Sequence, residues 1–217
     1  MLLSPKSTPG VLLDFDGTLV DSLGPLREAF YRFISLQGVD TPDIDFEDVT
    51  PLPLVDVVRL LRLRYEWTSP EDRLLTEYLD QTRAAVVSSM PMPDAVWFLQ
   101  ACGQLGAPVC IVTSGEESGV WQWIERMQLV ELVASVVGFA TVTKRKPHPE
   151  PYLIASERIF RPITNCIAVE DSIVGALSAW HAGARTYVLG SASIPGVCNV
   201  GSLKDVYSEV ERQCTLS

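Results

Sequence analysis

The spacing of apolar residues divides the chain near residue 90. Between residues 21 and 90, apolar positions recur every three or four residues, which is typical of helices that bury one face. Amphipathic segments of this kind are found at 25–36, 54–65 and 71–87. No part of this region has a convincing strand pattern, so the sequence predicts a helical domain here.

From residue 91 onward, short apolar runs alternate with amphipathic segments. The runs predict strands at 109–113, 135–140, 166–170 and 185–189, and the segments between them predict helices at 94–105, 116–128, 149–160 and 172–182. Strands that alternate with helices favour a parallel sheet with right-handed crossovers. The tail beyond Gly190 is expected to add one short helix near 203–212.

An earlier apolar run, Val11–Leu13, precedes the helical region and completes this pattern. Consecutive apolar residues without alternation are typical of a strand that is covered on both faces of a parallel sheet. The predicted fold class is therefore α/β, with a doubly wound, Rossmann-like parallel sheet. We expect residues 1–20 and 91–217 to form the sheet domain and residues 21–90 to form an inserted α-helical domain.

The composition is that of a globular protein and excludes several classes of partner. Hydrophobic residues make up 47% of the chain and charged residues 20%, and the formal net charge is −10. An acidic balance argues against nucleic acid or an anionic membrane as the main partner. No apolar stretch approaches the roughly 18 to 20 residues of a membrane helix, and the N-terminal residues lack the pattern of a secretion signal, so we expect a cytoplasmic protein. The five cysteines are scattered and form no CxxC pair, which argues against a disulfide framework or a zinc site.

Two carboxylates follow the first predicted strand. Asp14 falls at its carboxyl end, the edge where open α/β sheets bind ligands. Gly17 allows a sharp turn, which would leave Asp14 and Asp16 beside the same space. Two negative groups this close repel each other, so either one takes up a proton or a cation lies nearby. The alternative is an ordinary surface turn, because Asp-Gly is also a common turn and hairpin sequence.

Polar residues end two later strands as well. Thr113 and Ser114 follow an apolar run and precede a predicted helix, where a hydroxyl and backbone N–H groups suit an oxyanion or a phosphate. Glu170 and Asp171 end another run and offer the hard oxygen ligands that Mg²⁺ prefers. Each signal taken alone also fits an ordinary helix cap.

Lysine is rare in this chain, yet two of its four lysines, Lys144 and Lys146, lie in one short segment. Lys146 stands directly before a proline, where a positive charge can offset the negative charge of a phosphoryl group. Lys144 and Arg145 are interpreted as solvated charges or as guides for an anionic substrate.

These residues together resemble the signatures of the haloacid dehalogenase-like superfamily, most of whose members are phosphatases. The sequence VLLDFDGTLV at Val11–Val20 resembles the first signature, and Lys-Pro-x-Pro-x-x-Tyr from Lys146 resembles the third. Thr113 and Asp171 match the positions of the second and the fourth. The helical insert is similar to the small cap of the group that contains β-phosphoglucomutase and phosphoglycolate phosphatase.

The resemblance implies a reaction at phosphorus. Asp14 would attack to give an aspartyl-phosphate, and Asp16 would protonate the leaving oxygen and later take a proton from water. Thr113, Ser114 and Lys146 would bind the phosphoryl group.

The resemblance also implies a magnesium ion. Its ligands would be Asp14, the backbone carbonyl of Asp16, and Asp171. Glu170 would bind it either directly or through water, and the sequence leaves these two possibilities open.

The predicted function is thus a magnesium-dependent phosphatase that acts on a small phosphorylated metabolite. Asp16 argues against dehalogenase and phosphonatase chemistry, whose enzymes lack an acid/base aspartate at this position. A sugar-phosphate mutase is the first alternative, although the only histidines, His148 and His181, lie outside the insert where such mutases place one. More distant alternatives are a phospho-receiver module and a non-catalytic binding protein on the same fold.

Overall fold

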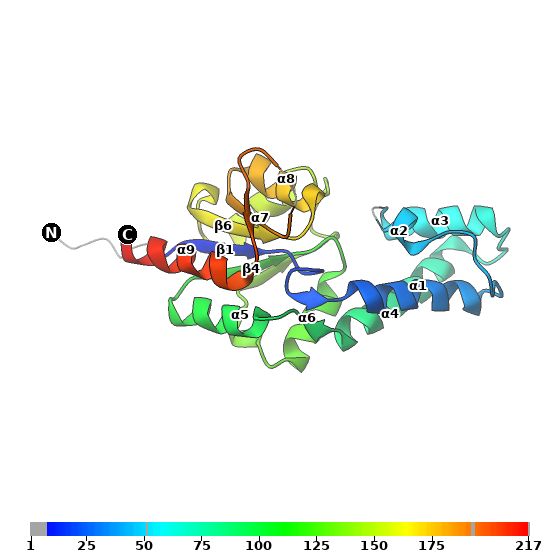
Figure 1. Ribbon diagram of the computed structural model, residues 1–217. Helices are drawn as coiled ribbons and strands as arrows, with labels where there is room; N and C mark the ends of the chain where they lie inside the picture. The colour runs from blue at the N-terminus through cyan, green and yellow to red at the C-terminus, as the bar shows by residue number, and fades with distance from the viewer. Residues whose placement is uncertain (1–7, 51, 192–193, 217) are drawn as a thin grey trace. The chain divides into compact units, whose positions relative to one another are not determined.

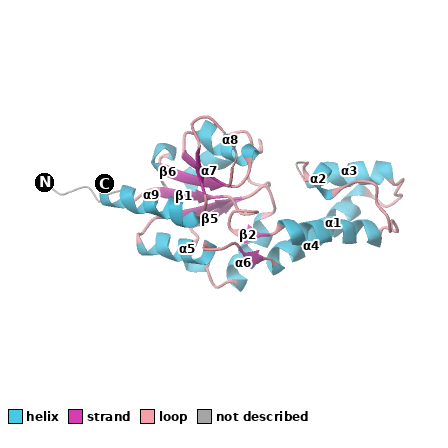
Figure 2. Cartoon of the chain, in the orientation of Figure 1, coloured by secondary structure: helices cyan, strands magenta, loops and turns pink. Residues whose placement is uncertain are grey.

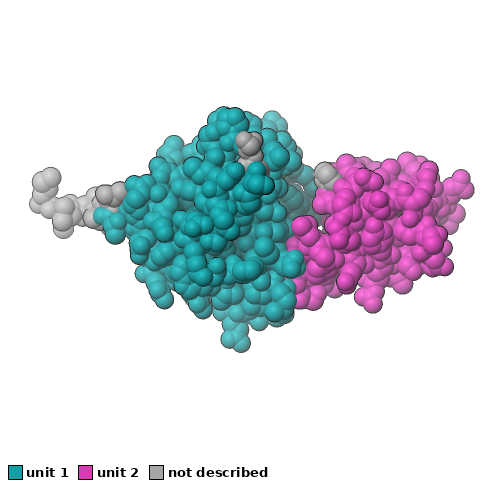
Figure 3. Space-filling view, viewed as in Figure 1, with its two compact units in different colours: residues 1–21, 90–217 teal, residues 22–89 magenta. Residues whose placement is uncertain are grey.

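The computed structural model describes residues 8–50, 52–191 and 194–216. Contacts within the chain divide it into two compact units. Unit 1, teal in Figure 3, contains the described parts of residues 1–21 and 90–217, and unit 2, magenta, contains those of residues 22–89. Unit 2 is therefore an insertion in the sequence of unit 1. Across the described ranges, no helix combines the length and the apolar character that crossing a membrane requires.

Unit 1 is built around a six-stranded parallel sheet in the order β5–β4–β1–β6–β7–β8. Figure 2 draws the strands in magenta. Its strands are β1 (Gly10–Leu13), β4 (Val109–Val112), β5 (Ser135–Val137), β6 (Cys166–Glu170), β7 (Arg185–Leu189) and β8 (Cys198–Val200). Every residue of β1, β4 and β6 is buried, as expected for inner strands that are covered on both faces. The α/β fold class predicted from the apolar runs is confirmed.

Strand β1 lies inside the sheet, between β4 and β6. Its residue Val11 pairs with Val109 of β4 on one side and with Ile167 of β6 on the other. The chain runs outward from β1 through β4 to β5, then crosses β1 and continues through β6, β7 and β8. Open α/β sheets bind ligands at the carboxyl ends of the strands where the winding reverses in this way. The ends of β1, β4 and β6 are therefore the place where this fold favours chemistry.

Helices cover both faces of the sheet (Figure 1). Helices α7 and α8 pack together on one face, against β4, β6 and β7, while α5 and α6 lie on the other face. Helix α9 packs against α5 and β8. The helices of unit 1 are α5 (Ala95–Gln104), α6 (Glu117–Arg126), α7 (Glu150–Arg158), α8 (Ile173–Ala182) and α9 (Leu203–Leu216), with the 3-10 helices η1 (Val130–Leu132) and η2 (Ile163–Asn165). The core under α7 and α8 joins Tyr152 and Ala179 to Leu12 and Ala168 of the sheet.

The two points where the chain leaves and re-enters unit 1 pair with each other. Strands β2 (Val20–Asp21) and β3 (Met90–Pro91) form a two-stranded antiparallel ribbon. The Met92 N–H also donates to the carbonyl of Leu19 over 2.8 Å. The sequence pattern predicts neither strand, because two residues are too few to show an alternation.

Unit 2 consists of helices around an apolar core of its own. Its helices are α1 (Leu23–Leu36), α2 (Phe46–Val49), α3 (Leu54–Arg64) and α4 (Glu71–Ser88). Both α1 and α3 pack against α4, and Phe33 of α1 stacks on Tyr78 of α4 with ring centroids 4.8 Å apart. The three predicted amphipathic helices are confirmed as α1, α3 and α4. Helix α2 is a single turn, which is too short to give a periodic signal.

Three elements of unit 1 differ from the sequence-based expectation. The strand expected at 135–140 ends at Val137, because Gly138 donates its N–H to Oε1 of Glu117 (2.9 Å) instead of continuing the ladder. The tail contains β8, whose residues are exposed or half-buried and so lack the apolar signal of a strand. Helix α9 also continues to Leu216, beyond the predicted end at residue 212.

Candidate functional site

Asp14 follows β1 directly, at the position that the apolar run predicts. Its N–H donates to the carbonyl of Val169 in β6 (2.9 Å), which extends the sheet ladder by one residue and fixes the start of the turn. The turn then closes on itself, because the Gly17 N–H donates to the carbonyl of Val20 (2.8 Å). The buried ring of Phe15 packs edge-on against Trp123 with centroids 5.4 Å apart. Packing and backbone bonds thus hold the turn that carries Asp14 and Asp16.

Gly17 brings a third carboxylate to this turn. Its φ of +81° lies in the left-handed region that favours glycine. A Cβ atom at this position would collide with the carboxylate of Asp171, which follows β6. The missing side chain therefore lets Asp171 lie directly against the turn between Asp14 and Val20.

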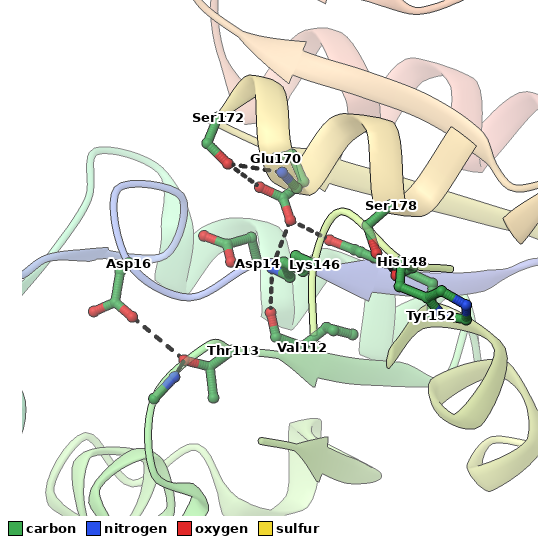
Figure 4. A network of polar contacts seen from close by, with 12 residues as sticks. Asp14, Asp16, Val112, Thr113, Lys146, His148, Tyr152, Glu170, Ser172 and Ser178 are labelled. Carbon is green, nitrogen blue, oxygen red and sulfur yellow. Dashed lines mark hydrogen bonds and ion pairs between the residues drawn. The ribbon is translucent and has the colours of Figure 1, made fainter. Parts of the chain in front are cut away.

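Lys146 reaches the same place from the loop that follows β5, and its ammonium is fully bonded. Its Nζ atom donates to Oδ1 of Asp14 (2.6 Å), to Oε1 of Glu170 (2.6 Å) and to the carbonyl of Val112 (2.9 Å). The side chain is only 6% exposed. Because an ammonium has three N–H donors, these acceptors fix its position. Figure 4 shows Lys146 between the ends of the strands that supply these acceptors.

Glu170, the last residue of β6, is enclosed by side-chain donors. Its side chain is 0% exposed. Oε1 accepts from Lys146 and from the hydroxyl of Tyr152, and Oε2 accepts from Oγ of Ser172 (3.1 Å) (Figure 4). A Cβ atom on Gly175 would collide with this carboxylate. Glu170 is therefore packed and bonded from several sides within the protein.

On the other side of β1, Thr113 contacts the second aspartate of the turn. Its N–H donates to the carbonyl of Val137 (2.9 Å), and its Oγ1 donates to Oδ2 of Asp16 (3.3 Å). The same Oγ1 accepts from the N–H of Gly115 (2.9 Å), so the hydroxyl is oriented by the loop before α6. Ser114, the neighbour of Thr113, is exposed in that loop. The hydroxyl of Thr113 and the carboxylate of Asp16 thus form a pair of their own (Figure 4).

The electrostatics of the cluster favour an additional positive charge. Burial and the carboxylate of Glu170 raise the pKa of Asp14 well above its usual range, although Lys146 opposes this shift. Burial and Glu170 also raise the pKa of Asp171, to about 6. Burial alone would lower the pKa of Lys146, but Asp14 and Glu170 outweigh it and keep the ammonium charged. One lysine therefore leaves an excess of negative charge among these acids.

The donor atoms fit a hard cation. Within the described residues, carboxylate oxygens of Asp14, Glu170 and Asp171 lie within 4.8 Å of one another. Mg²⁺ takes oxygen ligands in octahedral geometry and usually keeps several waters, so a few carboxylates suffice. The predicted ligands Asp14 and Asp171 are thus brought together, while the side chain of Asp16 bonds to Thr113.

Two residues near the site, Tyr152 and Ser172, have roles that cannot be read from the sequence. Tyr152 is the final residue of the Lys-Pro-x-Pro-x-x-Tyr segment, so its position is marked, but its bond to Glu170 depends on the fold. Ser172 both donates to Glu170 and accepts from the Gly175 N–H as the N-cap of α8. The side chain of His148 accepts on Nδ1 from the Glu150 N–H (3.2 Å) at the start of α7.

Comparison with known proteins identifies similar sequences and folds. A family model described as haloacid dehalogenase-like hydrolase matches residues 11–189. The phosphoglycolate phosphatase of Xanthomonas campestris is 28% identical over 176 residues, which cover 80% of this chain and 79% of that protein. The bifunctional riboflavin kinase/FMN phosphatase of Arabidopsis thaliana is 23% identical and matches 88% of this chain, which spans only 50% of that larger protein.

The crystal structure of CbbY from Rhodobacter sphaeroides in complex with phosphate has a similar fold. It superimposes with a TM-score of 0.80, covering 92% of this chain and 96% of CbbY, at 18% sequence identity. The identity is low, so the likeness concerns the arrangement of helices and strands.

Proposed function

Because the chain belongs to the family of haloacid dehalogenase-like hydrolases, we propose that it is a magnesium-dependent phosphatase that hydrolyses a small phosphorylated metabolite through an aspartyl-phosphate. The observation that carries this proposal is the ammonium of Lys146, which lies 2.6 Å from Oδ1 of the buried Asp14. A carboxylate must approach an anionic phosphate in such a reaction, and fixed positive charge reduces their repulsion.

The residues around Asp14 support a division of work. Asp14 would form the bond to phosphorus while the bond from phosphorus to the leaving oxygen breaks. Asp16 would donate a proton to that oxygen and then accept a proton from the water that hydrolyses the aspartyl-phosphate. The bond from Thr113 to Asp16 supports this assignment, because it holds the acid beside the loop proposed to bind the phosphoryl group together with Ser114 and Lys146.

We assign the magnesium site to Asp14, Asp171 and the backbone carbonyl of Asp16, with Glu170 close by. The clustering of carboxylate oxygens and the excess negative charge support this assignment. When bound, the ion would neutralise charge on the phosphoryl oxygens.

The substrate is proposed to be a phosphorylated small molecule. The relative in Xanthomonas campestris is a phosphoglycolate phosphatase, and CbbY was crystallised with phosphate. The formal charge of −10 favours a small substrate over a nucleic acid. We further propose residues 1–20 and 91–217 as the catalytic core and residues 21–90 as its cap.

The direct test is phosphate release from p-nitrophenyl phosphate and from a panel of phosphorylated metabolites, with Mg²⁺ and with EDTA. The wild-type protein is expected to be active only with the metal. Asp14→Asn should abolish turnover and prevent phosphorylation of the protein, detected by mass spectrometry after acid quenching. Asp72→Asn makes the same chemical change at an exposed carboxylate of α4 and should leave turnover unchanged. Activity retained in Asp14→Asn would exclude the proposed nucleophile.

The same assay separates a phosphatase from a sugar-phosphate mutase. A phosphatase releases inorganic phosphate in proportion to the substrate consumed. A mutase would convert a sugar phosphate into its isomer with little release, and that result would overturn the proposal in favour of the alternative.

A further inference from the structure

Tyr152 contacts Lys146 directly with its ring and indirectly with its hydroxyl. It lies in the first turn of α7, six residues after Lys146, and its side chain is 0% exposed. Its ring lies 5.4 Å from the Nζ atom of Lys146, and its hydroxyl bonds to Oε1 of Glu170, the oxygen that also accepts from Lys146. The ring and the hydroxyl thus act on the same ammonium, one directly and one through a carboxylate.

The direction of the bond between Tyr152 and Glu170 is set by chemistry. An ionised carboxylate can only accept, so the tyrosine hydroxyl donates. A tyrosine keeps its proton at neutral pH, because its ordinary pKa is about 10. Bonds between a hydroxyl and an ionised acceptor are stronger than neutral ones.

The bonds to Glu170 restrict where its carboxylate can turn. Oε1 is held by Tyr152 and Lys146, Oε2 is held by Ser172, and Gly175 closes the remaining side. A carboxylate held in this way keeps facing Lys146. Without the tyrosine hydroxyl, Oε1 would depend on the lysine alone.

We propose that Tyr152 is a positioning residue, whose hydroxyl fixes Glu170 against Lys146 and so directs the ammonium to Asp14. This inference rests on the proposed phosphatase function and adds to it a residue that acts without touching the substrate. It also assigns Glu170 to holding Lys146.

Tyr152→Phe tests the hydroxyl alone, because it keeps the ring against Lys146. We expect kcat to fall about tenfold, as for other supporting groups around a catalytic site, with KM changed less than about twofold. Tyr207→Phe is the matched control, since it removes a hydroxyl that donates to Glu211 (3.3 Å) on the exposed side of α9. It should leave both constants unchanged.

A double-mutant cycle with Glu170→Gln tests whether Tyr152 acts through Glu170. Groups that act through one another give non-additive effects. Tyr152→Phe should therefore lower kcat far less in the Glu170→Gln background than in the wild type. If the fold-decrease in kcat of the double variant equals the product of the two single fold-decreases, Tyr152 does not act through Glu170 and the proposal is wrong. A lower melting temperature with unchanged kcat would likewise reduce Tyr152 to a packing residue.

A readout without turnover separates this inference from the proposed function. The chain has only four lysines, at positions 6, 144, 146 and 204, so lysine-selective ¹⁵N labelling allows the buried ammonium of Lys146 to be followed by NMR. Its protons should exchange with water at least about tenfold faster in Tyr152→Phe, because one of the groups that holds its acceptor is lost. Unchanged exchange would overturn the inference even if the wild-type protein hydrolyses phosphate esters, and faster exchange would support it even if no ester is cleaved.

If Tyr152→Phe does not fold, 4-fluorophenylalanine at position 152 fills the space of the hydroxyl without its donor. The same loss of kcat and the same faster exchange are expected from this variant. A variant that folds and behaves as the wild type does would reject the positioning role.

Discussion

Lys146 Nζ lies 2.6 Å from Oδ1 of Asp14, although the two residues are 132 positions apart in the chain. They meet because β1 and β5 are parallel strands of one sheet, so the turn after β1 and the loop after β5 begin at the same edge. Both side chains are buried, so each is the charge partner that the other needs in a poorly solvated place.

Lys146→Met is expected to destabilise the protein strongly, because it leaves Asp14 and Glu170 buried without their counter-ion. Losing one partner of a buried ion pair costs about 3 to 5 kcal/mol. Chemical denaturation in EDTA measures the loss in the free energy of unfolding. The exposed neighbour supplies the control: Lys144→Met should change this free energy by less than about 0.5 kcal/mol. Equal effects of the two substitutions would contradict the pairing.

Asp16→Asn should slow the hydrolysis of esters with poor leaving groups more than that of esters with good leaving groups. A general acid contributes about 10² to 10⁴ to the rate, but p-nitrophenolate leaves without much help from a proton. The ratio of kcat/KM for p-nitrophenyl phosphate to that for an alkyl phosphate is therefore expected to rise in the variant. An unchanged ratio would remove Asp16 from the role of acid.

Stabilisation by Mg²⁺ should increase with pH. The pKa of Asp171 is raised to about 6 by burial and by Glu170, so the metal-free folded state holds this proton more tightly than the unfolded state. Its contribution to stability is present at low pH and is lost as the pH rises through about 6. Mg²⁺ needs the ionised carboxylate, so the gain from the metal grows over the same interval.

Melting temperatures with Mg²⁺ and with EDTA, measured between about pH 5 and pH 8, check this dependence. Asp171→Asn should remove most of the pH-dependent gain. A gain from Mg²⁺ that is constant across the range would argue against Asp171 as a ligand.

Gly175→Ala is expected to disturb Glu170, since the added methyl group would occupy the space of its carboxylate. Overpacking costs about 1 to 3 kcal/mol, and a displaced Glu170 should lower kcat by about tenfold or more. Gly103→Ala is the comparison in another helix, where the added Cβ meets only the tip of Leu132 at 3.0 Å. That variant should keep full activity, and similar losses in both would point to a general effect of alanine.

Phe160→Gly is expected to stabilise unit 1. Phe160 has a φ of +54° and is 87% exposed, so it combines backbone strain with little burial. Relief of the left-handed strain is worth about 1 kcal/mol, or about 2 to 4 °C in melting temperature for a chain of this size. Phe160→Ala keeps the strain and should show no such gain, so equal melting temperatures for the two variants would refute the explanation.

Much of the site can be predicted from the sequence, because most of its functional residues follow an apolar run that becomes an inner strand. Val11–Leu13 predicts β1 and hence the place of Asp14, and Cys166–Glu170 predicts β6 and hence the place of Asp171. Lys146 follows no apolar run directly, and its place is predicted only by the resemblance of its prolines and tyrosine to a known signature.

What the sequence does not predict depends on contacts between distant residues. Nothing local in Tyr152 or Ser172 indicates that both donate to Glu170, because these bonds exist only after α7 and α8 pack on the sheet. The question of how Glu170 approaches a metal is open in the sequence for the same reason. Helix α2 is missed because a single turn is too short to show a period, and β8 is missed because its residues are exposed or half-buried.

The parallel order of the sheet has a consequence for synthesis and refolding. Lys146 follows Asp14 by 132 positions in the chain, so Asp14 leaves the ribosome first. Contacts between residues so far apart form slowly, because a long loop must close first. The acidic turn after β1 therefore lacks Lys146 and Glu170 until β6 adds beside β1, and recovery of hydrolysis during refolding would date the completion of the sheet.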